Sequence, residues 1–339
     1  MMKIFYAVQA TGNGHISRAN AIVPLLQKYG DVDVLISGTQ ADVFLEQPIA
    51  YLLHGFSFIF GQKGGVDIWK TIKKMKFFRL LADIKHLPVK NYDLVINDFE
   101  PISAWACQIR KVPCIALSHQ SAFLSPKTPR PAHKSAWAEL IFKYYAPSTN
   151  RLSFHFKAYD NSIYTPVIRS EIRALEPKDL GHITVYLPAY ADEFLLSYFE
   201  HIPDVRWQIF SKHCSQAYQQ NNVSVRPVSN TGFNQSLANA HGLITGGGFE
   251  GPAEALYLGK KLLLIPMKNQ YEQYCNAAAL AEMGVPVWFD LFQEKVALAK
   301  WLVSPQRIEV DYPDQTHDII SLIVSNNKFN YLEPFAIHA

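Results

Sequence analysis

Residues 243–256 have the sequence Leu-Ile-Thr-Gly-Gly-Gly-Phe-Glu-Gly-Pro-Ala-Glu-Ala-Leu. The apolar residues at the start of this stretch predict a buried parallel strand, the three glycines predict a tight turn, and the residues after them favour a helix. A helix that begins after such a turn presents unpaired backbone N–H groups and the positive end of its dipole. Both features suit a phosphate group, although an ordinary turn between a strand and a helix has the same pattern.

Three further features follow in a fixed order. Glu254 lies in the predicted helix about one turn from its start, where a carboxylate can accept hydrogen bonds from both hydroxyl groups of a ribose. A second apolar strand ends at Pro266, and residues 272–276 have the sequence Glu-Gln-Tyr-Cys-Asn. This order resembles the C-terminal signature of inverting glycosyltransferases of the GT-B fold. The resemblance is closest to the MurG-type peptidoglycan N-acetylglucosaminyltransferases, with the UDP-glycosyltransferases further away.

The resemblance implies a donor site in the second half of the chain. The diphosphate would bind at Gly246, Gly247, Gly248, Phe249 and Glu250. The ribose would bind to Glu254, the sugar hydroxyls to Glu272 and Gln273, and the base beside Val228, while Asn276 would brace the loop.

Two departures from the family pattern concern the phosphates. The UDP-glycosyltransferases commonly have a histidine where this chain has Gly246, so phosphate binding here would depend on backbone groups. Residues 187–190, Leu-Pro-Ala-Tyr, stand where the MurG type has a Gly-Gly-Ser loop. One phosphate contact of that family is therefore unaccounted for.

A second strand, glycine loop and helix begins the chain. Residues 3–9 are rich in Ile, Phe, Tyr and Val and predict a strand, and residues 11–15, Thr-Gly-Asn-Gly-His, follow it. The loop lacks the third glycine of a dinucleotide fingerprint, and Ser37-Gly38 stands where an acidic residue should end the next strand, which disfavours a dehydrogenase. The loop instead resembles the one that faces the interdomain cleft in the same glycosyltransferases. This resemblance implies that Gly12, Asn13 and Gly14 lie on the acceptor side.

His15 is the candidate general base, because an imidazole with a pKa near neutrality can take a proton from an acceptor hydroxyl. Asp98 ends the apolar run at residues 94–97 and is the candidate partner that orients His15, as an aspartate does in several plant relatives. The alternatives are a histidine that caps a helix or lies on the surface, and an aspartate that caps a turn.

Residues 115–121, Ile-Ala-Leu-Ser-His-Gln-Ser, parallel the His-Glu-Gln-Asn segment of the MurG type without its acidic residue. His119 and Gln120 would therefore border the acceptor pocket. The simpler alternative is that His119 closes the strand with a hydrogen bond to the backbone.

The length of 339 residues and the alternation of strand and helix patterns predict two doubly wound α/β units, that is, Rossmann-like domains facing a cleft. We expect an acceptor-binding domain at 1–163 and a nucleotide-sugar domain at 164–316. The residues at 317–339 would form a helical tail that packs back on the first domain, as in the GT-B fold.

The net charge of +3 argues against a nucleic-acid partner, and the four cysteines lack the spacing of a metal site. No secretory leader is evident, so we expect a reduced, cytoplasmic protein. The segments 69–90 and 125–134 combine basic with aromatic, apolar or proline residues. They suit an anionic membrane surface at the inner face of the membrane, or an amphipathic core helix with solvated lysines.

These observations predict an inverting, metal-independent glycosyltransferase whose nucleotide-sugar donor carries UDP. The donor is a substrate, so no cofactor is expected. The acceptor hydroxyl would belong to a lipid, an envelope glycan or a small molecule. Two alternatives use the same site: a nucleotide-sugar 2-epimerase of the same fold, and a protein that binds a nucleotide sugar without turnover.

Overall fold

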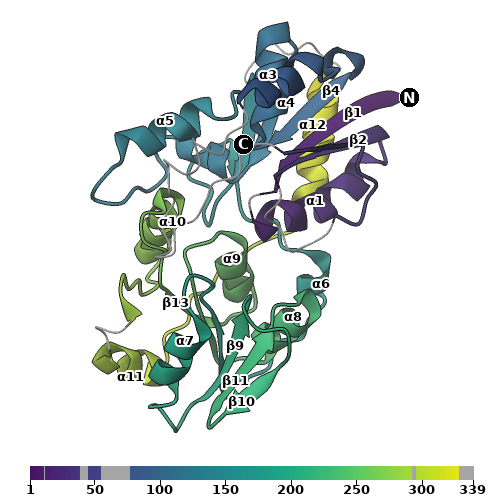
Figure 1. Cartoon of the computed structure of the whole chain (residues 1–339). Coiled ribbons are helices and arrows are strands. Elements are labelled where there is room, and N and C mark those ends of the chain that lie inside the picture. The colour runs from purple at the N-terminus through teal and green to yellow at the C-terminus, as the bar shows by residue number, and fades with distance from the viewer. Residues whose placement is uncertain (11, 39–44, 55–76, 292–294, 328–339) are drawn as a thin grey trace.

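A computed structural model describes residues 1–10, 12–38, 45–54, 77–291 and 295–327. The described chain forms two sheets, one in the upper and one in the lower half of Figure 1. The first has the order β3-β2-β1-β4-β5-β6-β7 and is parallel throughout. Its strands are β1 (Met2–Gln9), β2 (Gly30–Ser37), β3 (Tyr51–Leu53), β4 (Leu94–Asp98), β5 (Ile115–Ser118), β6 (Asn150–Phe154) and β7 (Ile163–Tyr164).

The second sheet has the order β10-β11-β9-β8-β12-β13 and is parallel except for β10. Its strands are β8 (His182–Tyr186), β9 (Arg206–Ser211), β10 (Tyr218–Gln220), β11 (Val223–Pro227), β12 (Gly242–Thr245) and β13 (Lys261–Leu264). The two parallel sheets confirm the prediction of two Rossmann-like units.

Helices cover both sheets. They are α1 (Asn13–Leu26), α3 (Phe77–His86), α4 (Pro101–Arg110), α5 (Ala136–Tyr144), α6 (Ser170–Arg173), α7 (Asp192–Phe199), α8 (Asn230–Asn239), α9 (Glu250–Tyr257), α10 (Tyr271–Glu282), α11 (Lys295–Val303) and α12 (Thr316–Asn327). Short 3₁₀ helices occupy Val89–Asn91 (η1) and Gln120–Leu124 (η2). The strand predicted at residues 3–9 is β1, and the apolar run at residues 94–97 lies in β4.

Each sheet is buried on both faces because its central strands alternate between two cores. In β1, Ile4 and Tyr6 pack into the core that also contains residues of α1 and α12, whereas Phe5 and Ala7 pack into the core under α3 and α4. In β12, Leu243 and Ile244 divide between two cores in the same way. Near-continuous apolar strands are therefore the sequence signal of this fold.

The chain returns to the first sheet at its C-terminal end. Helix α12 lies against α1, beside the strands at the top of Figure 1. Its residues Ile319, Ile320 and Ile323 are buried in the same core as Ile22 of α1. The residues that separate the two sheets, 165–181, include the short helix α6. The domain boundaries given above remain predictions.

In both sheets the strand order reverses at an inner position. After the two strands that flank this position, the chain continues in opposite directions. The reversal lies between β1 and β4 in the first sheet and between β8 and β12 in the second. Such a point leaves a crevice at the carboxyl ends of the strands, which is where ligands bind in open α/β sheets. The two glycine loops follow β1 and β12, so both lie at these crevices.

Candidate active site

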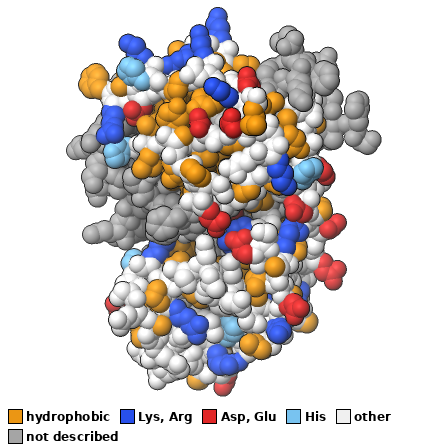
Figure 2. Space-filling view, turned by 90° about the vertical axis from the view of Figure 1, so that its right-hand side faces the viewer, with side chains coloured by type: hydrophobic (Ala, Val, Ile, Leu, Met, Phe, Trp, Pro, Cys, Tyr) orange, Lys and Arg blue, Asp and Glu red, His pale blue; other side chains and the backbone are white. Residues whose placement is uncertain are grey.

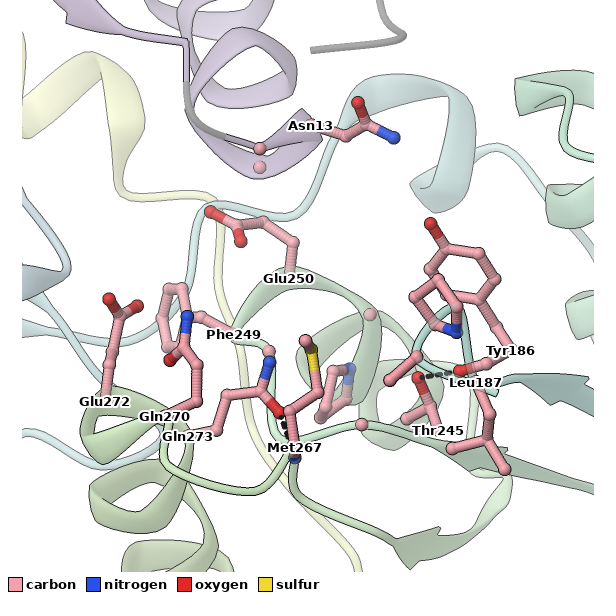
Figure 3. Close-up of a pocket in the computed structure, with 18 of the residues that line it drawn as sticks. Asn13, Tyr186, Leu187, Thr245, Phe249, Glu250, Met267, Gln270, Glu272 and Gln273 are labelled. Carbon is pink, nitrogen blue, oxygen red and sulfur yellow. Dashed lines mark hydrogen bonds between the residues drawn. The ribbon is translucent and has the colours of Figure 1, made fainter. Parts of the chain in front are cut away.

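A cavity of about 1350 Å³ opens between the two sheets, and both glycine loops line it. All predicted site residues except Asp98, Gly247 and the predicted brace Asn276 are in its wall. These lining residues are Gly12, Asn13, Gly14, His15, His119, Gln120, Val228, Gly246, Gly248, Phe249, Glu250, Glu254, Glu272 and Gln273. Figure 3 shows Asn13 on the upper wall and Glu250 pointing from α9 across the cavity toward it.

The first loop places His15 in the first turn of α1. The helix begins at Asn13 directly after Gly12, and His15 Nδ1 lies 2.8 Å from Asp98 Oδ1. Asp98 is fully buried at the end of β4. The structure therefore brings the two predicted catalytic residues together, with the aspartate behind the histidine and outside the cavity wall.

The turn after β4 is held rigidly, which fixes the position of Asp98. Glu100 caps α4 by accepting hydrogen bonds from the backbone N–H groups of Ile102 and Ser103, and Pro101 occupies the first turn. Asn97 donates to the carbonyl of Glu100 at 2.7 Å. A side chain that orients a catalytic imidazole needs such support, because small displacements weaken the hydrogen bond between them.

Arg18, for which no role was predicted, joins this pair. It donates two hydrogen bonds to Asp98, from Nε at 3.0 Å and from Nη2 at 2.8 Å, and its Nη1 donates to Glu250 Oε1 at 2.5 Å. Burial raises the pKa of Asp98, but Arg18 and His15 outweigh that effect and hold the pKa below its usual value. Asp98 is therefore a carboxylate at neutral pH, and it keeps a proton on Nδ1 of His15.

Gln120 and Glu272 meet at the same place from opposite sides of the cleft. The Gln120 side-chain Nε2 lies 3.3 Å from His15 Nε2 and donates to Glu272 Oε1 at 3.1 Å. The structure thus brings an acceptor-side residue, the candidate base and a predicted donor-sugar residue into one cluster.

His119 is a structural link between the two halves. Its Nδ1 lies 2.8 Å from the backbone carbonyl oxygen of Phe154, its Nε2 lies 2.8 Å from Asn276 Oδ1, and its ring stacks on Phe249 with centroids 3.8 Å apart. Burial lowers the pKa of His119, and Glu272 partly offsets that effect. The hydrogen bond between His119 and the backbone, which was the simpler alternative, is therefore present.

The second glycine loop is braced from behind. Gln273 Oε1 accepts hydrogen bonds from the backbone N–H groups of Gly247 and Met267, both at 2.9 Å, and Asn276 donates to the carbonyl of Gly247 at 3.0 Å. Gly247 therefore faces the protein, and the brace predicted for Asn276 is present. Within the described structure, only Nε2 of the Gln273 side-chain amide is left to contact a ligand.

The cavity side of this loop consists of backbone groups. No side chain caps α9, and a Cβ added to Gly248 or Gly251 would meet no heavy atom within 4 Å. The side chain of Phe249 is buried against His119, and that of Glu250 pairs with Arg18. Any phosphate contact at this helix must therefore come from main-chain N–H groups.

Glu254 is held by Arg169, a residue of the segment between the two sheets. Arg169 Nε donates to Glu254 Oε1 at 2.6 Å and Nη2 donates to Glu254 Oε2 at 3.0 Å. Burial raises the pKa of Glu254 above its usual value, and Arg169 opposes that rise. This pair was not predicted, since its members are 85 residues apart in the sequence.

A comparison with known protein families shows the family of this chain. The model of the family described as glycosyl transferase family 1 matches residues 2–304. The chain belongs to this family. No curated protein sequence matches it.

Solved structures of glycosyltransferases share the fold of this family member. MurG of Acinetobacter baumannii is 14% identical, with a TM-score of 0.53, and the match covers 95% of this chain and 99% of that one. Arabidopsis thaliana UGT89C1, solved with UDP-L-rhamnose, is 12% identical, with a TM-score of 0.57 and coverage of 97% and 95%. The glycotransferase of kitacinnamycin is 14% identical, with a TM-score of 0.57 and coverage of 97% and 95%. The fold is therefore GT-B, as the resemblance implied.

On the side of the first sheet, the cavity of this glycosyltransferase has an apolar, mainly aromatic wall. Phe99 follows β4, and α5 with the residue after it contributes Trp137, Ile141, Phe142 and Tyr145. Opposite them, near Val228, the lining includes Phe233, whose ring packs edge-on against Phe210 and Tyr186. Lys212 and His213, at the end of β9, also line the cavity and were not predicted.

The described residues contain no cluster of three or more His, Cys, Asp or Glu side chains that could hold a metal ion. The Asp-x-Asp triplet at Asp31-Val32-Asp33 lies in β2, outside the cavity wall, and Asp33 accepts a hydrogen bond from Tyr92. It is therefore not placed to bind a donor diphosphate through a metal ion.

Three observations concern the predicted surfaces. None of the helices in the described ranges is both long and apolar enough to cross a bilayer. Part of the basic segment 69–90, residues 69–76, lies outside the described residues. On the face drawn in Figure 2, blue and red side chains are interspersed, without a continuous basic field of the kind that nucleic acids require.

Proposed function

We propose that the protein is an inverting glycosyltransferase that uses a UDP-sugar. The observation that carries this proposal is the pair of His15 and Asp98, 2.8 Å apart, at a loop that faces the free N-terminus of α9 across one cavity. Because Asp98 keeps the proton on Nδ1, the lone pair of Nε2 can take the proton of an acceptor hydroxyl. The acceptor oxygen then attacks the anomeric carbon as the bond to the diphosphate breaks, which inverts that centre.

The second glycine loop would stabilise the leaving diphosphate. The backbone N–H groups at the start of α9 and the positive end of its dipole lie where negative charge develops, and Gly248 and Gly251 leave room for phosphate oxygens. Glu254 would hold the ribose, and Glu272 with Gln273 Nε2 would hold the sugar hydroxyls. This scheme uses no metal ion and no cofactor.

The acceptor would bind against the aromatic wall of the first domain. None of the wall residues Phe99, Trp137, Ile141, Phe142 and Tyr145 carries a charge, so the wall suits an apolar or aromatic alcohol, including a lipid. Epimerisation of the donor alone would need no such wall, which favours transfer.

An anionic membrane would hold the protein near a lipid acceptor. Helix α5 exposes Trp137 and Tyr144, with 61% and 51% of their surface accessible, next to the exposed Lys134 and Lys143. We expect the protein to sediment with anionic liposomes at low salt, and Trp137→Ser to weaken this binding. A wild-type protein that stays in the supernatant would exclude the membrane as a partner.

Calorimetry tests the donor site directly. We expect UDP to bind the wild type, and Glu254→Gln to weaken binding about tenfold through loss of a ribose hydrogen bond to a charged group. Glu171→Gln is the matched control, because Glu171 is the exposed partner of Arg169 and lies outside the cavity wall. Equal losses of UDP affinity in both variants would show that Glu254 acts by holding Arg169 and not by binding the ribose.

A further inference from the structure

The side chain of Gln120 contacts the candidate base, His15. Its Nε2 lies 3.3 Å from His15 Nε2 and 3.1 Å from Glu272 Oε1, and the residue is only 5% exposed. Both neighbours accept hydrogen bonds, since Asp98 keeps the His15 proton on Nδ1 and Glu272 is a carboxylate. The amide must therefore direct its N–H₂ group to both, which fixes its orientation.

The contact with His15 occupies the lone pair that the reaction needs. An acceptor hydroxyl can transfer its proton only to Nε2, and in the structure Nε2 accepts an N–H of Gln120. The Gln120 nitrogen also stands next to Glu272, where the donor sugar would lie. Its position therefore marks the place that the acceptor oxygen must take, between the base and the sugar.

The other end of the same amide shows that this arrangement can be displaced. Gln120 Oε1 is buried and has no hydrogen-bond partner among the described residues. A buried acceptor without a partner raises the free energy of the conformation that contains it. This cost opposes the two hydrogen bonds of Nε2, so an acceptor that offers its own hydroxyl to His15 can replace the amide.

We propose that Gln120 is a positioning residue that covers the base until an acceptor arrives and so suppresses hydrolysis of the donor. The proposal rests on the function proposed above. With the lone pair uncovered and the acceptor absent, a water molecule would donate its proton to His15 Nε2 while its oxygen attacks the anomeric carbon. The bond from that carbon to the diphosphate oxygen breaks, the products are the free sugar and the nucleoside diphosphate, and the proton passes from His15 to solvent.

The test compares two rates in one enzyme preparation. For the wild type and Gln120→Ala, nucleoside diphosphate release is measured without acceptor, and transfer is measured with an acceptor found by screening. We expect the ratio of hydrolysis to transfer to rise about fivefold in Gln120→Ala, as loss of one hydrogen bond of about 1 kcal/mol predicts. Partial unfolding lowers both rates together and leaves the ratio unchanged, so a structural role would not give this result.

Two further variants make the interpretation specific. Gln270→Ala removes another cavity-lining glutamine that has no described contact with His15, and its ratio should stay at the wild-type value. In His15→Ala/Gln120→Ala, the extra hydrolysis should disappear, because the uncovered base is its source. An unchanged ratio in Gln120→Ala, or extra hydrolysis that persists without His15, would overturn the proposal. A wild type that neither transfers nor hydrolyses any donor would instead contradict the proposed function itself.

Discussion

The two glycine loops have the same local structure but present different groups to the cavity. Each follows a central strand of its sheet and runs into a helix, α1 after Gly12 and α9 after Gly248. In the first turn of α1, His15 is oriented by Asp98 and has an Nε2 lone pair for a substrate. In the first turn of α9, the side chains of Phe249 and Glu250 are engaged by the first domain, and main-chain N–H groups remain.

This difference separates the chemistry into two parts. An imidazole can take up and release a proton, and the first loop supplies one in His15. Fixed N–H dipoles can stabilise charge without moving a proton, and the second loop supplies those. Changes at the first loop should therefore affect turnover, and changes at the second should affect nucleotide binding.

The largest effect is expected from His15→Ala. Removing a general base should lower kcat by about 10²- to 10⁴-fold, while the dissociation constant for UDP should stay within about twofold. His86→Ala is the matched control, since His86 is exposed on α3 and outside the cavity wall. Turnover retained in His15→Ala would remove this residue from the mechanism.

Asp98→Asn should affect both turnover and stability. It leaves Arg18 without its buried carboxylate partner, which we expect to cost about 3 kcal/mol in the free energy of unfolding at pH 7. Because the pKa of Asp98 is lowered in the fold, its stabilisation is complete above the unfolded value of about 3.9 and is lost as the pH falls through the lower, folded value.

Urea unfolding at a series of pH values measures this difference. The difference in the free energy of unfolding between the wild type and Asp98→Asn should be largest near pH 7 and should narrow below pH about 4. The exposed Asp204→Asn should match the wild type throughout. A gap that does not change with pH would mean that Asp98 is uncharged in the folded protein.

A smaller effect should distinguish the two sides of the second loop. In Gly247→Ala, the new Cβ would lie 2.7 Å from the backbone oxygen of Gln273, so we expect a loss of about 1–3 kcal/mol in stability. In Gly248→Ala, the methyl group meets no protein atom within 4 Å, so stability should change by less than about 0.5 kcal/mol.

UDP calorimetry then shows whether the cavity side of the loop binds the nucleotide. We expect Gly248→Ala to weaken binding about tenfold, since its methyl group takes space that a phosphate would need. Thermal melting of both variants reports their stability independently. Wild-type UDP affinity in Gly248→Ala would place the diphosphate elsewhere in the cavity.

The parts of the site that could be predicted are local in sequence. The strand, glycine turn and helix at each loop follow from apolar runs, glycines and helix formers within about 15 residues. The pairing of His15 with Asp98 could be anticipated because both follow central strands, whose carboxyl ends meet at one edge of the sheet.

What could not be predicted depends on contacts between distant segments. Arg18 is 232 residues from Glu250, and nothing in the spacing of α1 indicates that its guanidinium reaches both Asp98 and Glu250. The partner of Glu254 lies in the segment between the sheets. The family resemblance predicted Gln273 as a sugar ligand, yet its oxygen holds the loop, because a side-chain amide serves equally well for either purpose.

The most direct test of the central claim is the configuration of the product. A donor found to turn over should be followed by proton NMR through the coupling constant of the anomeric proton. Base-assisted displacement by His15 inverts the anomeric centre, so an α-linked UDP-sugar should give a β-linked product at the earliest time points. A product that retains the donor's configuration would contradict the mechanism.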